Sequence, residues 1–105
     1  MKPTSYIPVY RALYPEIAKT VKTHGYTLAI HGHLSRDMDL ICIPWLDELS
    51  EPEIVVSDIV EKHDLRVVGE PTIAKYGRRC WYMSVSYSDC VITLSFTPVP
   101  SDAIN

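Results

Sequence analysis

One stretch, residues 31–45, constrains the fold of this chain more than any other. It places two histidines, an arginine and two aspartates within nine residues and then runs directly into the apolar segment 38–43. Polar side chains buried without partners cost roughly 2–7 kcal/mol each. A polar cluster at the mouth of an apolar strand therefore indicates a functional site, and we expect the site of this protein here.

The same stretch predicts a β-hairpin. Residues 26–31 and 38–43 are strand-like, and the connection between them is short, so the two strands should pair antiparallel. The second strand carries apolar residues at both odd and even positions. Such a strand is typical of the middle of a sheet that is covered on both faces.

The rest of the chain supplies two helices and three further strands. We expect a helical turn at 9–14 that Pro15 ends or resets, and a helix from Pro15 to His24 that stops at Gly25. A capping box of Ser50 and Glu53 predicts a second helix to residue 64. Strands follow at 65–68, 79–87 and 90–97, with an irregular lead-in at 1–8, a turn at 75–77 and a flexible tail at 99–105.

The element order α-β-β-α-β-β-β predicts a two-layer α+β (or α/β) domain. Two helices should pack on a mixed, largely antiparallel sheet of about five strands. With 105 residues the chain has the length of one domain, and it contains no internal repeat.

Composition excludes several classes of protein. The net charge of −3 leaves no basic footprint for general nucleic-acid binding, and no apolar run is long enough to cross a membrane. The three cysteines, each within an apolar strand-like run, indicate buried free thiols in a reducing compartment. The N-terminus has no signal-peptide pattern, so we expect a cytoplasmic protein.

Asp37 and Asp39 lie two residues apart, so on a strand they point to the same face. Two neighbouring carboxylates are a donor set that suits Mg²⁺. The alternative is that they are aspartates at the end of a loop, hydrogen-bonded to the turn and screened by Arg36.

The role of His31 and His33 depends on the register of the hairpin. A three-residue loop would place His33 opposite Asp37 and His31 opposite Asp39, which is a set that could bind a transition metal. A two-residue loop would put the histidines and aspartates on opposite faces. The histidines would then be ordinary side chains of an edge strand.

Arg78 and Arg79 are candidates for clamping a phosphate or carboxylate, although adjacent strand residues point oppositely and only one can face a given site. The alternative is edge-strand charge that discourages aggregation. Trp45 and Trp81 are more typical of core or subunit-contact positions than of base stacking. The tyrosines at positions 6, 10 and 14 would form a stripe on a continuous helix, for contact with a protein partner or with the core.

Three motifs together resemble a family of small phage and prophage proteins of the nucleotidyltransferase-like kind. They are His-Gly-x-x-x-Arg-Asp-x-Asp-Leu followed by Pro-Trp (residues 31–45), Gly-Arg-Arg-x-Trp (77–81) and x-Leu-Ser-x-x-Pro (93–98). The resemblance implies a reduced nucleotidyltransferase-like fold. It implies that Gly32 belongs to a phosphate-holding turn, and that Asp37 and Asp39 hold Mg²⁺ in an active member.

The chain departs from that pattern at two positions. His33 stands where the superfamily has a serine, and Thr93 stands at the aligned position of a third carboxylate on the last strand. Asp89 shares the parity of Thr93 but lies about 13 Å away along a strand. Candidate ligand-binding residues are Gly32, His33, Arg36, Arg78 and Arg79.

The functional expectation follows from the resemblance and these departures. We expect a small phage-type accessory protein, in the host cytoplasm if phage-encoded, with a degenerate site. It would bind a protein, a second copy of itself or a nucleotide-like ligand rather than catalyse a reaction, and no cofactor is assigned. The alternative is an active minimal Mg²⁺-dependent nucleotidyltransferase that modifies a protein or RNA.

Overall fold

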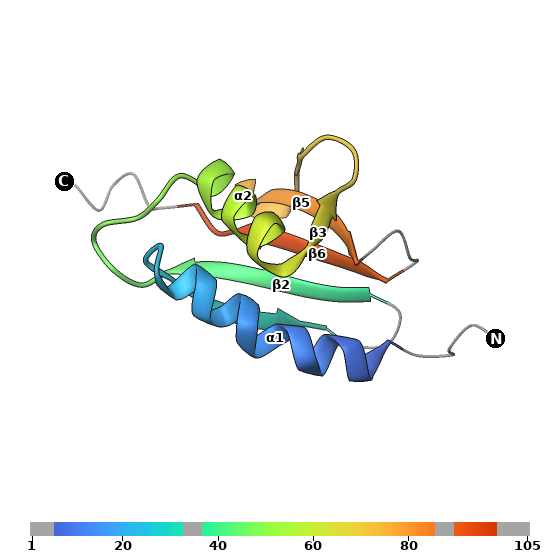
Figure 1. Ribbon diagram of the computed structural model, residues 1–105. Coiled ribbons are helices and arrows are strands. Elements are labelled where there is room, and N and C mark those ends of the chain that lie inside the picture. Colours follow the sequence, from blue (N-terminus) through green and yellow to red (C-terminus); the bar gives the residue numbers. More distant parts are fainter. Residues whose placement is uncertain (1–5, 33–36, 86–89, 99–105) are drawn as a thin grey trace.

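A twisted mixed sheet with two helices on one face forms the protein, as the computed structural model in Figure 1 shows. The structure describes residues 6–32, 37–85 and 90–98. The helical elements are α1 (Ile7–Lys22), α2 (Pro52–His63) and the short 3₁₀ helix η1 (Lys75–Gly77). The strands are β1 (Tyr26–His31), β2 (Asp37–Pro44), β3 (Leu65–Val67), β4 (Thr72–Ile73), β5 (Arg79–Val85) and β6 (Val91–Phe96).

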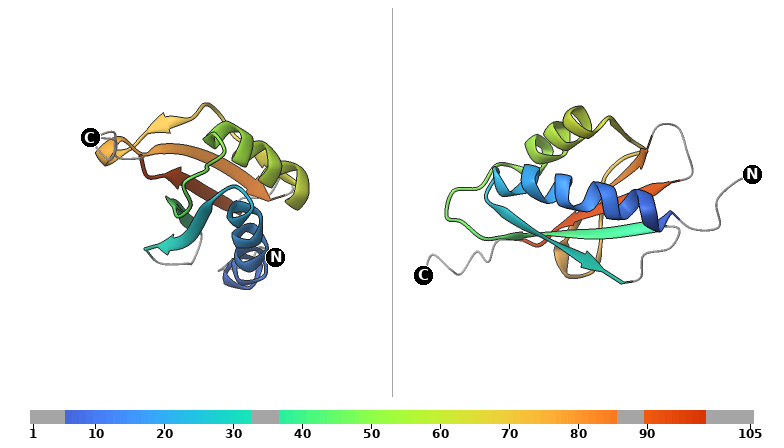
Figure 2. Two further views of the ribbon diagram at one scale, coloured as in Figure 1. Left: turned by 90° about the vertical axis from the view of Figure 1, so that its left-hand side faces the viewer. Right: turned by 60° about the horizontal axis from the view of Figure 1, so that its bottom comes forward.

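The strands are ordered β1-β2-β6-β5-β3, and β4 pairs with β5 beside β3. Among the strands of the described residues, only β2 and β6 pair in parallel, because the chain crosses over through α2 before β6 returns to lie beside β2. Both helices lie on the same face of the sheet in all three views (Figures 1 and 2). The predicted fold class is confirmed: two helices pack on a mixed, largely antiparallel sheet. The sequence did not predict β4.

The antiparallel β1–β2 hairpin is also confirmed. β2 is an interior strand, as expected, but the expectation that it is covered on both faces is wrong. Its residues Met38, Leu40 and Cys42 are buried toward the helices, whereas Asp37 and Asp39 are exposed on the other side. Since neither α1 nor α2 covers that side in the part of the chain that the structure describes, we call it the open face.

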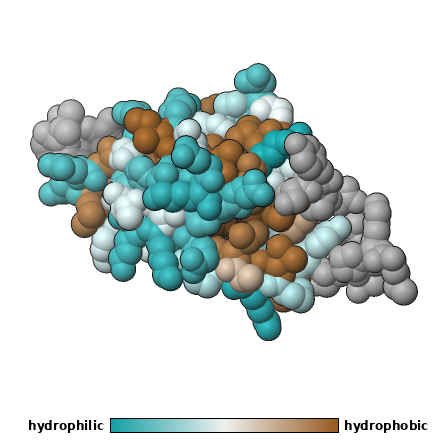
Figure 3. Space-filling view, viewed as in Figure 1, coloured by the Kyte–Doolittle hydropathy of each residue, from teal (hydrophilic) through white to brown (hydrophobic). Residues whose placement is uncertain are grey.

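The core lies between the sheet and the helices. Ile17 and Val21 of α1 and Val55 and Ile59 of α2 are fully buried against the apolar residues of β2, β5 and β6. Burying such a side chain contributes about 1.5–3 kcal/mol. The outer surface of this helical layer is largely hydrophilic, with smaller hydrophobic areas between the polar residues (Figure 3).

α1 is one continuous helix, so the predicted interruption at Pro15 is wrong, and so is a lead-in that extends to residue 8. Pro8 lies in the first turn, where its missing N–H is not needed, and Pro15 sits on the exposed side of the helix interior. Tertiary contacts offset the lost hydrogen bond. The Tyr10 hydroxyl donates to the Val91 carbonyl at 3.1 Å, and the Tyr14 hydroxyl donates to the Leu28 carbonyl at 2.7 Å. The tyrosine stripe therefore faces the sheet.

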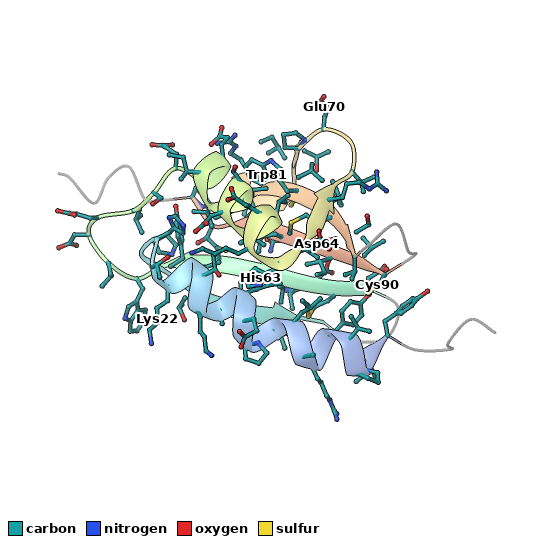
Figure 4. All side chains as sticks on the ribbon, viewed as in Figure 1. Lys22, His63, Asp64, Glu70, Trp81 and Cys90 are labelled. Atoms are coloured by element: carbon teal, nitrogen blue, oxygen red, sulfur yellow. The ribbon has the colours of Figure 1, made fainter. Side chains whose placement is uncertain are left out.

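α2 begins as predicted near residue 52, but the predicted capping box does not form. Glu51 is the N-cap and makes no side-chain cap hydrogen bond. Both members of the expected box have stronger partners elsewhere: Ser50 contacts His24, and Glu53 forms an ion pair with Arg79. At the other end of α2, His63 points toward α1, where its Nε2 lies 2.8 Å from Thr20 Oγ1 (Figure 4).

All three cysteines are buried and free, as predicted. Trp81 is in the core, but Trp45 is not, since three quarters of its surface (75%) is exposed. Among the described residues, no helix combines the length and apolarity that spanning a membrane requires. The predicted tail at 99–105 and the end of the strand expected at 79–87 lie outside the described residues.

Candidate functional site

The open face carries two rows of side chains that run across neighbouring strands. In the first row, His31 pairs with Asp39, Asp39 with Thr93, and Thr93 with Tyr82, which joins β1, β2, β6 and β5. In the second row, Ile41 of β2 pairs with Ser95 of β6, and Ser95 with Cys80 of β5. Because paired residues in a sheet point to the same side, these side chains form one surface.

A tight turn positions Arg78 beside these rows. Tyr76 and Gly77 both have positive φ (64° and 75°), and the Ala74 N–H donates to the Arg78 carbonyl at 2.7 Å. A tyrosine at positive φ is strained. Arg78 follows this turn and directly precedes β5, so its side chain lies beside the two rows.

Arg78, Ala74 and the two rows enclose a shallow cavity of about 310 Å³. Its floor is Ile41, Ser95 and Cys80, and its rim includes His31, Asp39 and Tyr82. The Tyr82 hydroxyl lies 2.8 Å from Thr72 Oγ1, which fixes that side of the rim. The volume is at the small end of ligand pockets in proteins.

The Arg78 guanidinium is only partly satisfied. Its Nη1 donates to Ser95 Oγ at 3.5 Å, which is a long bond, and its buried Nε has no hydrogen-bond partner among the described residues. No carboxylate of the described residues lies within ion-pair distance of it. A buried charged donor without a partner is costly, so it marks a position where an anion would bind.

The pKa of the Cys80 thiol, on the floor of the cavity, depends on burial and on both charged groups of the cavity walls. Burial raises the pKa of its thiol, while Arg78 lowers that pKa and Asp39 raises it again. Both charges therefore act on the same buried sulfur from the walls of one cavity. The thiol stays protonated and is a packing group here, not a nucleophile.

The structure separates the two predicted arginines, as expected for adjacent residues. Arg78 faces the cavity, whereas Arg79 lies on the helix side with its Nη2 2.6 Å from Glu53 Oε2 and its guanidinium 4.9 Å from the Trp81 ring centroid. Glu53 raises the pKa of Arg79, and Arg79 lowers the pKa of Glu53. Arg79 therefore does not face the cavity that Arg78 borders, and its charge is paired with Glu53 between β5 and α2; ligand binding by Arg79 stays a prediction.

The hairpin register agrees with the three-residue loop, since His31 lies opposite Asp39. His33 and Arg36 lie outside the described residues, so their predicted ligand contacts stay predictions. Gly32 has φ of 77° and open space where a Cβ would be. That conformation suits a glycine and leaves room for a ligand beside it.

A Mg²⁺ ion would find two exposed carboxylates here, Asp37 and Asp39, on one face of β2. No group of three or more His, Cys, Asp or Glu within the described residues could hold a metal ion. Two carboxylates fit a Mg²⁺ ion only if water and substrate phosphates complete its shell. Thr93, the residue paired with Asp39 on β6, supplies a hydroxyl where a third carboxylate would complete the site.

Sequence reasoning missed Tyr82, Ser95, Cys80 and Thr72 as parts of this surface. Side chains two residues apart on a strand share a face, so the even-numbered residues of 79–87 form one set and the odd-numbered residues of 90–97 form another. Placing these two sets on the same face requires the register between the two strands. The pairing of the last strand with β2, which no local pattern encodes, was the missing piece of information.

The geometry stands without support from known relatives. Comparison of the sequence with models of protein families gives no match, and comparison with curated proteins gives no match either.

Proposed function

We propose that the protein binds a phosphorylated, nucleotide-like ligand in the open-face cavity and acts by binding rather than by catalysis. The observation that carries this proposal is the partly buried Arg78 guanidinium, whose Nε has no partner inside a cavity that also holds Asp39.

A phosphate is the group that suits Arg78 best. A guanidinium presents several N–H donors in a plane, and a phosphate accepts two of them at once. A phosphate placed in the cavity would accept from Nε and Nη1 and would replace the long contact with Ser95. Hydrogen bonds to charged groups contribute about 1.5–3 kcal/mol.

The opposite wall suits the sugar of a nucleotide. The exposed Asp39 carboxylate is an acceptor for hydroxyl groups, and His31 and Tyr82 flank it in the same row. Asp37 and Asp39 would hold Mg²⁺ when the ligand carries several phosphates, and the ion would neutralise part of their charge. The cavity accommodates a monophosphate or one end of a larger nucleotide.

Thr93 favours binding over catalysis. The transfer chemistry implied by the resemblance uses three carboxylates, and the residue next to Asp39 on the neighbouring strand is a threonine. The second candidate is a minimal Mg²⁺-dependent nucleotidyltransferase acting on a protein or RNA. Asp37 and Asp39 on one exposed face favour it.

A phage-encoded accessory role follows from the resemblance alone. For a protein partner or a second copy, the exposed side chains of Trp45 and Leu46 next to β2 offer apolar surface.

Calorimetric titration with ATP in the presence of Mg²⁺ tests the binding proposal. We expect Arg78→Gln to weaken binding about 10- to 100-fold, since it removes charged hydrogen bonds to phosphate. Arg79→Gln is the matched control, because its side chain lies on the helix side and should leave ATP affinity unchanged. Equal affinity for wild type and Arg78→Gln would overturn the proposal.

A further inference from the structure

A second polar cluster lies at the end of the helical layer, away from the open-face cavity. His24 Nδ1 is 2.7 Å from Ser50 Oγ, and His24 Nε2 is 2.7 Å from Asp58 Oδ2. His24 follows α1, Ser50 precedes α2, and Asp58 lies within α2. The fold thus assembles a continuous Ser–His–Asp chain of hydrogen bonds from three separate segments.

The chemistry of the acid fixes the direction of these hydrogen bonds. His24 and Lys62 lower the pKa of Asp58, so its carboxylate is ionised and can only accept. A neutral His24 must then carry its proton on Nε2 and leave Nδ1 as an acceptor. The Ser50 hydroxyl therefore donates to Nδ1, which is the polarity that activates a serine. The two ring nitrogens are exchanged relative to the serine-protease arrangement.

Backbone contacts hold Ser50 and His24 in place. The Ser50 N–H donates to the His24 carbonyl at 3.1 Å, and the Tyr26 hydroxyl donates to the Ser50 carbonyl at 2.9 Å. The His24 side chain is 14% exposed, so the imidazole is fixed but reachable by water. The pair is pre-oriented, which is what a nucleophile and its base require.

A cavity of about 260 Å³ is lined in part by Ser50. Tyr26, Leu49, Pro52, Phe96 and Pro98 give it mostly apolar walls. Arg79 and Glu51 add charges of opposite sign to its walls, and the charge of Arg79 is partly neutralised by its ion pair with Glu53. The volume and apolarity fit a small uncharged acyl group rather than a nucleotide.

We propose that Ser50 is a nucleophile for esters of small apolar acids, with His24 as its general base and Asp58 as the positioning residue. Ser50 Oγ bonds to the ester carbonyl carbon while its proton moves to His24 Nδ1. The carbon–oxygen bond to the alcohol then breaks, and His24 returns the proton to the leaving alkoxide. Water reverses the sequence: it attacks acyl-Ser50, loses a proton to His24, and releases the acid with restoration of the Ser50 hydroxyl.

This proposal does not depend on the open-face cavity. A negative result for nucleotide binding would therefore leave it unchanged, and a negative result here would leave nucleotide binding unchanged. The same three side chains could serve only to fix the α1–β1 corner to α2. Such a structural role predicts no reactivity of Ser50 above that of any other serine. Ser57, an exposed serine next to Asp58 on α2, is the matched comparison.

Covalent labelling of the full chain by diisopropyl fluorophosphate is the test, followed by mass spectrometry and peptide mapping. We expect one adduct, at Ser50, formed with loss of fluoride. Ser57→Ala should label as wild type does. His24→Gln should slow labelling about 100-fold or more, which is the usual contribution of a general base.

A second readout does not depend on any variant folding. In the native wild type at neutral pH, Ser50 should label at least about 100-fold faster than Ser57 of the same molecule, because His24 accepts the Ser50 proton. No adduct at Ser50, or labelling of Ser50 at the rate of Ser57, would overturn the proposal.

Discussion

Replacing Thr93 by Asp tests whether a carboxylate on β6 next to Asp39 completes a Mg²⁺ site on the open face. Thr93 is half-buried on β6 and pairs with Asp39 on β2. Neighbouring strands are about 4.8 Å apart, so the new carboxylate would lie roughly 5 Å from that of Asp39. The Coulomb repulsion at that distance is about 1–3 kcal/mol, and the lower figure applies because Asp39 is exposed.

The expected result is a protein that is less stable without Mg²⁺ and more dependent on it. A loss of about 1 kcal/mol lowers the melting temperature by about 4 °C for a domain of this size. Mg²⁺ at about 100 times its dissociation constant adds about 2.7 kcal/mol and should more than restore it. Thermal unfolding followed by circular dichroism, with and without Mg²⁺, measures both effects.

Thr27→Asp is the matched control for this experiment. Thr27 is on the same face, but it pairs with Ile43, four residues along β2 from Asp39 and so about 13 Å away. At that distance salt screens most of the repulsion. If Thr93→Asp responds to Mg²⁺ no more than Thr27→Asp does, then Asp39 and residue 93 do not form one site.

Three further predictions concern the frame of the fold. Gly25→Ala should lower the free energy of unfolding by about 2–4 kcal/mol in chemical denaturation, because Gly25 has a φ of 93° and a Cβ there would collide with the Glu48 carbonyl. Gly69→Ala, with open space around the glycine, should lower it by about 1 kcal/mol. Equal losses would contradict the close approach. Burial lowers the pKa of His63, so the folded protein favours the neutral imidazole. The contribution of His63 to the free energy of unfolding is therefore full above its unfolded pKa of 6.5 and is lost as the pH falls below that value. His63→Gln should lose less stability than the wild type between about pH 7 and pH 5. Burial raises the pKa of Cys42, so iodoacetamide should not modify it until the protein unfolds, and rapid modification in the native protein would refute its burial.

The sequence was sufficient for the hairpin and the two-layer class because these depend on local patterns. The alternation in 26–31 and 38–43 and the short connection between them are enough to pair β1 with β2. The sequence was insufficient for the coverage of β2, because the apolar Ile41 and Ile43 resemble core residues, yet they lie on the open face. Which face the helices cover is a tertiary property.

Local rules failed where tertiary contacts competed with them. Pro15 normally ends a helix, but Tyr10 and Tyr14, in the turns that precede it, hydrogen-bond the helix to the sheet. Ser50 and Glu53 have the spacing of a capping box, but His24 and Arg79 bind them instead. In both cases the partner is distant in sequence and invisible to a window of neighbouring residues.

The candidate site was predicted in part. Asp39 and Arg78 were both chosen from the sequence, and the fold brings them to one cavity. Nothing in the spacing revealed that Thr93 and Ser95 lie between them, because that depends on the parallel pairing of β2 with β6. The Ser50–His24–Asp58 chain was missed for the same reason, since its members are brought together by tertiary contacts: the packing of α1 against α2 and the backbone hydrogen bond between Ser50 and His24.

Binding at the open face is the central claim, and an amide NMR titration of the wild-type protein with ATP and Mg²⁺ tests it most directly. The account predicts that the largest shift changes fall on Asp39, Arg78, Thr93 and Ser95, which surround the cavity, and that the helices change little. Shift changes confined to α1 and α2, or none with ATP in millimolar excess, would contradict it.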